Sequence, residues 1–446
     1  SNNWTLPAII SEMLVDDIEV SGGFASFSYY ESLFSPHITA YISFLDTGTS
    51  VKASSEQDVQ ERYGTLFSSK PNLANKDSSI ILEHGSGVLD FSSTYPLKIT
   101  KVNRIEKDKR QVLIVQLESK YALTNEETHV TGAYYNKIST SVNDILVNEL
   151  EIPSSQIVID ESLNSESFKG NNRRPFDLIR DLCPRTLSLT DVPGYVFFEA
   201  QSQSAKTSTN KFNFRALDVL LNQTPKTGYS YGEIATFCHG SNYKILSYDF
   251  VKDGDIMKDL RSGKLCSRTV FFNPSTFEHQ EIIVFVNEET KKITILGSEE
   301  IPSDFQEKNG KFTRTYVTCE AAGSNEVGVS TAVINNARKW RALASMRYNL
   351  LYTNVLEMVV PCNLNLKAGD MISCAFPKKT DNPELGILDE KVSGNYLILH
   401  LSHHFNTGAN NEVASTTHMT LVRDSYGLYS IDGGFDDTDL VSGEEE

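Results

Sequence analysis

Residues 355–376 read VLEMVVPCNLNLKAGDMISCAF, which is two apolar runs separated by a polar corner. The runs Val355–Val360 and Met371–Phe376 hold the valines and large apolar residues that favour strands. The arc from Asn363 to Asp370 holds the Asn, Gly and Asp residues that are typical of turns. No side chain in this stretch is suited to catalysis. It therefore predicts two successive strands separated by a turn.

Alternating apolar and polar residues extend this β pattern over residues 15–133, in runs such as FASFSYYESLF, HITAYISFLD and RQVLIVQLES. Strands with one buried face, separated by turn residues, are typical of an antiparallel barrel or sandwich. Strand signatures return from residue 243, and residues 355–425 add NYLILHLSHHF and STTHMTLVRD. Two β-domains, each an antiparallel barrel or sandwich, are therefore expected.

Helical spacing interrupts the β pattern in the middle of the chain. Ile138, Val142 and Ile145 fall on one helix face before Pro153, and the segment PFDLIRDL begins with Pro175 in its first turn. The expected fold class is mainly β with a smaller α+β part. The predicted units are a first β-barrel domain (1–137), an α+β middle domain (138–236), a second β-barrel domain (237–285 and 338–430), an insertion in that barrel (286–337) and an acidic tail (431–446).

Net charge separates this chain from proteins that bind nucleic acids tightly. The 446 residues carry a formal charge of −17; seven acidic residues and no basic ones lie after position 431, so the rest carries −10. Tight binding to phosphates depends on clustered Lys and Arg. Specific DNA binding is therefore disfavoured, and the segment from Asp432 to Glu446 is predicted to be a mobile tail.

Cysteine spacing and hydropathy argue against further classes. The six cysteines include no CxxC pair, which argues against a zinc ribbon and for reduced thiols in a protein assembled in a cytoplasm. The first residues, SNNWTLPAIISEML, lack the basic and apolar regions of a signal peptide. No window reaches the roughly 18 apolar residues of a membrane span. We expect neither export by the usual route nor a membrane span.

The strongest metal candidate is LILHLSHHF, which holds His400, His403 and His404. Side chains alternate along a strand, so His400 and His404 are expected on one face with Ser402, and His403 on the other. Positions i and i+4 lie roughly 13 Å apart at ~3.3 Å per residue, too far to share a metal ion directly. Hydrogen-bonded or solvent-facing histidines are therefore expected, with no metal and no cofactor.

Other motifs for catalysis are weak. His84-Gly85-Ser86-Gly87 lacks the G-x-S-x-G order of a nucleophile elbow and is expected to be a glycine-rich turn. The acids at 253–255 and 381–390 do not fit a calcium loop and are expected to be a helix cap and a surface loop. Walker, dinucleotide-binding and HExxH motifs are absent. A pair of carboxylates that converge for glycoside hydrolysis stays open, because any two acids can meet in space.

The order of motifs resembles the baseplate hub subunit of contractile-tailed bacteriophages, which is related to the hub part of type VI secretion spike proteins. The first motifs are ESLFSPHITAYISFLD (31–46), STSVNDILVNEL and RPFDLIRDL. A late signature runs from Pro361 to Asp370, then through Gly394-Asn395-Tyr396 to His403, and ends in THMTLVRD. The match extends from about residue 12 to 427. A glycine is common in the family where Cys362 stands, so the corner either needs no positive φ or is strained.

The resemblance implies a structural part that is not an enzyme. Hub subunits of this kind form homotrimers in which two similar β-barrels per chain make a pseudo-six-fold ring. The expected partners are the tail tube protein, the central spike protein, and baseplate wedge or tape-measure proteins, while DNA passes through the lumen without specific binding. The expected location is the tail baseplate of a virion, assembled in the host cytoplasm. A further hypothesis is that acidic groups face the lumen and repel phosphates.

Contacts between subunits in such a ring require strand edges, and one strand in each β-domain is expected to supply them. The candidate residues are Tyr41, Ile42, Ser43 and Phe44 in the first domain and Leu356, Glu357, Met358, Val359 and Val360 in the second. Two alternatives stay open. One is the hub of a non-viral contractile injection machine, and the other is a tail-associated enzyme that hydrolyses the cell wall.

Overall fold

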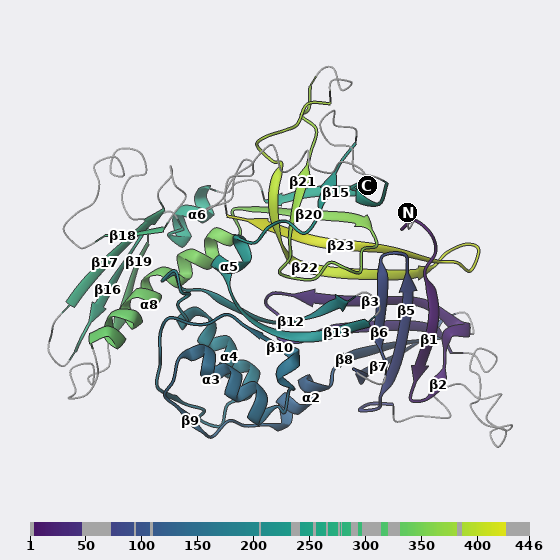
Figure 1. Cartoon of the computed structure of the whole chain (residues 1–446), viewed down its shortest axis with the longest axis horizontal. Coiled ribbons are helices and arrows are strands. Elements are labelled where there is room, and N and C mark those ends of the chain that lie inside the picture. The colour runs from purple at the N-terminus through teal and green to yellow at the C-terminus, as the bar shows by residue number, and fades with distance from the viewer. Residues whose placement is uncertain are drawn as a thin grey trace.

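The computed structural model shows a chain built mostly of β-strands, with most of its helices at one side (Figure 1). The predicted fold class, mainly β with a smaller α+β part, is confirmed. The predicted acidic tail, the acids at 253–255 and most of the predicted insertion lie outside the described residues. The structure describes residues 4–46, 73–92, 95–107, 110–204, 207–232, 241–252, 256–264, 266–274, 277, 279–286, 293–296, 314–319, 331–380 and 386–424.

One ten-stranded sheet forms the body of the molecule. Eight of its strands follow one another, and every neighbouring pair is antiparallel. β21 (Met371–Ala375) pairs with the start of β22, and β14 (Gly228–Ser230) pairs with β21. The run of eight is β15 (Ser247–Lys252), β20 (Asn354–Pro361), β23 (Val413–Arg423), β22 (Gly394–Thr407), β3 (Phe24–Ser32), β4 (Thr39–Leu45), β8 (Arg110–Ser119) and β7 (Leu97–Lys107).

The order of these eight strands is a tandem repeat. We name β3, β4, β7 and β8 half A, and β15, β20, β22 and β23 half B. In chain order these are the first to fourth strands of each half, and both halves lie in the sheet in the order first, second, fourth, third. The third strand of half B, β22, pairs with the first strand of half A, β3. The halves therefore follow each other head to tail.

Pairing registers make the halves equivalent residue by residue. In half A, Ile99 pairs with Leu117 and a bulge follows; in half B, Ile398 pairs with Leu421 and a bulge follows. The second strands correspond in the same way, because Tyr41 and Glu357 pair with equivalent residues of β8 and β23. Equivalent buried positions that result are Leu113 and Thr417, Val115 and Met419, and Leu117 and Leu421.

Alternation along the strands gives the sheet one buried face. In β8, Leu113, Val115 and Leu117 are fully buried, whereas Ile114 and Gln116 lie half-buried on the opposite side. The buried side of half A packs on smaller sheets and on the middle helices, and that of half B packs on β21 and Tyr229. We call the opposite side of the large sheet the open face.

Four smaller sheets and six α-helices complete the described part. The sheets are β2-β1-β5-β6 (Ile18–Glu19, Ile9–Val15, Ser78–His84, Gly87–Phe91), β10-β13-β12 (Ile157–Ile159, Thr207–Ala216, Tyr195–Ser204), β11-β9 (Phe168–Lys169, Ala133–Tyr134) and β18-β17-β16-β19 (Ile293–Leu296, His279–Val286, Cys266–Phe272, Arg314–Cys319). The helices are α2 (Lys120–Glu127), α3 (Ile138–Asp144), α4 (Pro175–Leu182), α5 (Leu217–Leu221), α6 (Ile256–Ser262) and α8 (Thr331–Leu351).

The helices expected in the middle of the chain are present. α3 continues as a π-helical turn (Ile145–Glu149), and α4 begins at Pro175. The polar stretch at 201–211 forms much of β12 and β13. These strands pair without interruption from Tyr195 opposite Ala216 to Ser204 opposite Thr207, so the ladder continues through the hydroxyl residues.

The stretch at 355–376 contains two strands, but they are not neighbours. β20 pairs with β15 and β23, whereas β21 pairs with β22 and β14. The corner between them is buried at Cys362, Leu364 and Ala368. The positive φ of this corner is at Gly369, +87°, and Cys362 has none. The cysteine is therefore not strained by its backbone.

The predicted division into domains stays a prediction. β16, β17, β18 and β19 form a sheet of their own, and the expected boundary at residue 285 falls inside β17. Phe271 and Val284 of this sheet pack against Leu343 and Met346 of α8. Figure 1 shows the sheet and α8 together at the left, away from the hairpin end of β22–β23 at the right.

Candidate functional site: the open face and free edges of the large sheet

Strands β22 and β3 join the two halves inside one chain. Seven residue pairs run in antiparallel register from His400 opposite Ser32 to Asn406 opposite Ser26. On the buried side, the rings of Tyr29 and His403 are stacked with centroids 6.1 Å apart. The junction is therefore a fully paired contact between the third strand of one half and the first strand of the other.

The equivalent strands at the ends of the run have a free edge. In the described part of the chain, β15 pairs with β20 alone, and β7 from Lys101 onward pairs with β8 alone. Residues 75–77 cover the start of β7, as β21 covers the start of β22. Ile105 on β7 and Val251 on β15 are 48% and 57% exposed. Such edges are templates for pairing with another chain.

The strands predicted to supply edges do not supply them. β4, with Tyr41, Ile42, Ser43 and Phe44, lies between β3 and β8, and β20, with Leu356, Glu357, Met358, Val359 and Val360, lies between β15 and β23. The two sets lie in equivalent central strands. A central strand has the most regular alternation of apolar and polar residues, so it is the easiest strand to recognise in a sequence. Their contact with a neighbouring subunit stays a prediction.

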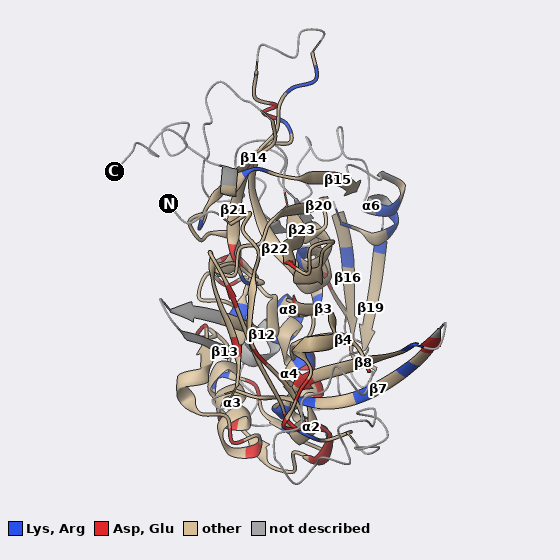
Figure 2. Cartoon of the chain, turned by 90° about the vertical axis from the view of Figure 1, so that its right-hand side faces the viewer, with Lys and Arg blue, Asp and Glu red and all other residues tan. Residues whose placement is uncertain are grey.

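Hydroxyl, imidazole and tyrosine side chains line the open face. Figure 2 shows strands such as β3, β4 and β22 mostly in tan, whereas β7 carries several charged residues. The hypothesis that acidic groups face a lumen stays a prediction. One row across the strands is Thr39, Tyr30, Ser402, His418, Val359 and Ser247, and the next is Ser32, His400, Thr420, Glu357 and Asp249.

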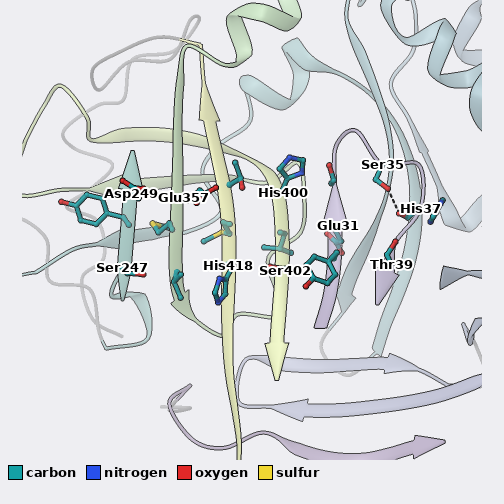
Figure 3. A pocket seen from close by; sticks show the side chains of 18 residues that line it. Glu31, Ser35, His37, Thr39, Ser247, Asp249, Glu357, His400, Ser402 and His418 are labelled. Carbon is teal, nitrogen blue, oxygen red and sulfur yellow. Dashed lines mark hydrogen bonds between the residues drawn. The ribbon is translucent and has the colours of Figure 1, made fainter. Parts of the chain in front are cut away.

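A hollow of about 630 Å³ lies on the open face beside the junction. Figure 3 shows Asp249, Glu357, His418, Ser402 and His400 around it, each from a different position on neighbouring strands. Asp249 and Glu357 are directly opposite each other in the register of β15 and β20. Like charges in that position repel, so this edge of half B favours a partner without further negative charge.

The predicted alternation of the histidines is confirmed. His403 is fully buried on the core side, and its Nδ1 lies 2.8 Å from Thr417 Oγ1. Burial, with smaller contributions from His404 and His84, lowers the pKa of His403 to about 3. This imidazole therefore stays neutral at neutral pH.

His404 lies on the open face of the junction, between hydroxyls of two strands. Its Nδ1 is 3.1 Å from Ser28 Oγ, and its Nε2 is 2.8 Å from Ser402 Oγ. The ring centroid of His418 is 4.4 Å away. Burial and the neighbouring His418 lower the pKa of His404 to about 4, and burial also lowers the pKa of His418 and of His400.

A buried carboxylate fastens three parts of the chain. Glu31 accepts hydrogen bonds from Tyr29 Oη at 2.6 Å, from the Gln201 N–H at 2.7 Å and from the Ala368 N–H at 2.8 Å. It forms no ion pair with any described residue, and burial raises its pKa to about 7. Glu199, which accepts from Tyr95 Oη at 2.6 Å, is buried in the same way. Neither role has a signal in the sequence, because both depend on partners that are distant along the chain.

The His84 and Ser86 pair is part of a turn between β5 and β6. Ser86 Oγ lies 2.7 Å from His84 Nδ1, while His84 Nε2 lies 2.9 Å from the carbonyl oxygen of Trp4. Ser86 Oγ also accepts from the N–H of Leu364 at 3.0 Å and is buried. These contacts tie the turn to the corner after β20.

Two further properties complete the site. No group of three or more His, Cys, Asp and Glu side chains within the described ranges is arranged to hold a metal ion. Across that same part of the chain, no helix is both long and apolar enough to cross a membrane.

No family model and no curated protein matches the chain. Solved structures do align with it. A tail protein from Neisseria meningitidis has 8% identity and a TM-score of 0.48, with 94% of this chain and 97% of that chain covered. The 43 kDa tail protein of prophage MuSo2 from Shewanella oneidensis has 11% identity and a TM-score of 0.48, with coverages of 90% and 95%.

A type VI secretion component from E. coli, described as structurally similar to tail proteins of bacteriophage T4, has 11% identity and a TM-score of 0.43, with coverages of 96% and 80%. The structures similar to the chain are thus tail proteins of phages and prophages and proteins of type VI secretion, the groups that the sequence resembles. These TM-scores are below 0.5, so the likenesses are distant. Function is therefore inferred from the chain's own residues.

Proposed function

We propose that the chain is a structural hub subunit of a contractile phage tail and that three copies close into a ring, the number that the resemblance implies. One observation carries the proposal: the strand order repeats, and the repeat ends in two free edges. β22 pairs with β3 within the chain, and the equivalent strands β7 and β15 have no such partner among the described residues. Pairing of β7 with β15 of the next copy would place six halves in equivalent contacts.

The internal junction supplies the register of this contact. The bulge of β7 is followed by Lys101 and the bulge of β22 by His400. Ile105 and His404 lie four residues after these positions and are therefore equivalent. Asp249 is equivalent to Ser28, because they pair with the equivalent residues Glu357 and Tyr41. Since His404 pairs with Ser28, Ile105 of one copy is expected opposite Asp249 of the next, antiparallel.

The two rims of such a ring differ in their repeat. Because the two halves are equivalent in strand order and register, a ring would carry the hairpin ends of β7–β8 and β22–β23 on one rim, one from each half. In Figure 1 the helices α3 and α4 and the sheet beside α8 lie at the left, away from the hairpin end of β22–β23, and they occur once per chain. A ring of three would therefore present about six similar units on one rim and three on the other. This fits an adaptor between the tail tube and the three-fold central spike.

The open face would line the lumen of the ring. Its hydroxyl-rich wall offers few cations, which suits passage of DNA without specific binding. The proposal places the protein in the tail baseplate of a virion, with the tube and spike proteins as main partners and wedge or tape-measure proteins as further ones. It assigns the chain no enzymatic step.

Mass photometry of charge variants tests the ring. The wild-type chain is expected to show a trimer at micromolar concentration. Ile105→Glu places a carboxylate opposite Asp249 of the next copy and is expected to weaken the trimer roughly ten-fold or more. Asp249→Lys added to Ile105→Glu is expected to restore it. Tyr41→Glu is the matched control, because Tyr41 is 37% exposed on the same face but on an interior strand.

Three results would contradict the ring. These are a wild-type monomer at all accessible concentrations, an Ile105→Glu variant that assembles as well as the wild type, and a double variant that assembles no better than Ile105→Glu alone. Circular dichroism of each variant confirms that its strands are formed.

A further inference from the structure

The open face at the junction of the two halves carries a cluster of imidazoles and hydroxyls for which the ring has no use. His404 on β22 and His418 on β23 have ring centroids 4.4 Å apart, with an angle of 64° between the rings. The hydroxyls of Ser28 and Ser402 hydrogen-bond to the two nitrogens of His404, and Thr416 Oγ1 lies 3.1 Å from His418 Nε2. Ser402 and His418 also line the hollow beside the junction.

Protonation of His404 changes the direction of its hydrogen bonds with the hydroxyls of Ser28 and Ser402. A neutral imidazole has one N–H and one acceptor nitrogen, so one serine donates to His404 and the other accepts. An imidazolium has two N–H donors, so both serine hydroxyls must accept from it. Ser28 and Ser402 each make this one side-chain hydrogen bond with described residues. Their own protons then point away from the ring, toward the open face.

We propose that His404, His418, Ser28, Ser402 and Thr416 form a binding site for a phosphate oxyanion, and that the site forms when the two imidazoles take up protons. The protonated pair supplies two positive charges, and the three hydroxyls supply donors. Phosphate has several acceptor oxygens that can be shared among donors from three strands. The anion also offsets the repulsion between the two rings, so proton and anion bind together.

The surrounding charged and titratable groups set the pH of this response. Burial, together with repulsion between the rings, holds His404 and His418 neutral near pH 7, which closes the site there. Buried His403, below the same strand, stays neutral over this range, and the carboxylates Glu357 and Asp249 of half B line the hollow beside the cluster. The groups that face the cluster are Tyr30 and Tyr41 from half A and His400, His403, Glu357 and Asp249 from half B.

The equivalent place in half A contains no imidazole. Ile105 stands where half B has His404, and Ile114 stands where it has His418. The site therefore occurs once per chain, although the strands that carry it occur twice. It needs no second copy, because all five side chains come from one chain.

Titration calorimetry with the full chain tests the site. The main probe is sulfate, whose charge stays constant between about pH 5 and pH 7.5, so a change in affinity reports on the protein. Inorganic phosphate and a short DNA duplex are the second and third probes. We expect the Kd for sulfate to be roughly ten-fold lower at about pH 5 than at about pH 7.5. Histidine labelled with ¹³C at Cε1 is expected to show His404 gaining its proton as sulfate is added.

Substitutions test whether the gain in affinity in acid comes from this cluster or from other histidines. His404→Gln with His418→Gln is expected to lose the gain in acid, and His129→Gln, at an exposed histidine away from the sheet, is expected to keep it. Ser28→Ala with Ser402→Ala retains both imidazoles and is expected to reduce the gain several-fold. If the double histidine variant does not fold, the double serine variant decides.

The outcomes show whether the site exists and whether its phosphate is a free ion or part of DNA. A gain for sulfate and inorganic phosphate alone identifies a free oxyanion as the ligand, and an equal gain for duplex DNA identifies a phosphodiester. Equal affinity at both pH values for all three probes would overturn the proposal. So would a gain that persists without His404 and His418. Ile105→Glu is expected to keep the gain, so failure of the ring and failure of the site are separate results.

Discussion

Halves A and B have the same strand order, register and bulge, but they differ in the side chains on the open face. Half A has Lys101, Ile105 and Ile114 where half B has His400, His404 and His418. They also differ in the connection between the first and second strands, which is residues 33–38 in half A and residues 253–353 in half B. Backbone pairing is thus the shared feature, and side chains and insertions make each half specific.

The largest expected effect tests whether the halves share one core. Ile42 and Met358 are equivalent and buried. Ile42→Ala and Met358→Ala are each expected to lower the free energy of unfolding by about 2–5 kcal/mol. Because β22 and β3 join the halves, urea denaturation is expected to show one transition in both variants. Two separate transitions would mean that the halves unfold independently. Ser43→Ala, on the open face of β4, is the control and is expected to change little.

The buried titratable group of half A gives the next largest effect. Burial raises the pKa of Glu31 from 4.5 to about 7. Its contribution to stability is therefore full below about pH 4.5 and is lost as the pH rises through 7. Over that range the loss is on the order of 3 kcal/mol. Glu31→Gln is expected to remove this loss, so that its stability relative to wild type improves from pH 5 to pH 8. If Glu31→Gln and the wild type show the same pH dependence of the unfolding free energy in urea denaturation, the assignment of this loss to Glu31 is wrong.

In half B, the buried side chain of His403 has the opposite effect on how stability depends on pH. Burial lowers the pKa of His403 from 6.5 to about 3, so its contribution is full above about pH 6.5 and is lost as the pH falls. Between about pH 6.5 and pH 5 this loss is on the order of 2 kcal/mol. His403→Gln keeps a hydrogen-bonding group near Thr417 and is expected to flatten the acid side of the stability profile. A profile as steep as that of the wild type would show that other histidines dominate.

The corner after β20 gives the smallest effect. Cys362 is fully buried and has no positive φ, so Cys362→Gly is expected to lower stability by about 1 kcal/mol or more through chain entropy and lost contacts. Gly369→Ala is the companion, because Gly369 has a φ of +87° and a Cβ there would lie 3.0 Å from Phe198 Cζ. Thermal denaturation is expected to show a loss in both variants. A gain for Cys362→Gly would mean that the cysteine is strained after all.

Local pattern was enough to predict the fold class. Alternation in FASFSYYESLF and RQVLIVQLES predicted β3 and β8, and helical spacing before Pro153 predicted α3, because these signals depend on near neighbours. The alternation of His400, His403 and His404 was predictable for the same reason.

Pairing between distant strands was beyond the sequence. β20 and β21 were expected as successive strands, but each pairs with strands elsewhere in the chain. Among the described residues, the free edges at β7 and β15 follow from the order of the whole sheet, which no single stretch contains. Glu31 was missed because its partners, Gln201 and Ala368, lie 170 and 337 residues away. Chemistry that depends on such meetings requires the three-dimensional structure.

Disulfide crosslinking across the predicted contact tests the ring most directly. Ile105→Cys and Asp249→Cys are combined in one chain, with exposed Cys319 changed to Ser, and the oxidised protein is separated without reductant. The account predicts a covalent ring of three, since these positions are expected to be directly opposite. Ile105→Cys with Ser247→Cys, shifted by two residues, is predicted to crosslink poorly. Monomer alone from the first pair, or equal crosslinking by both pairs, would contradict the account.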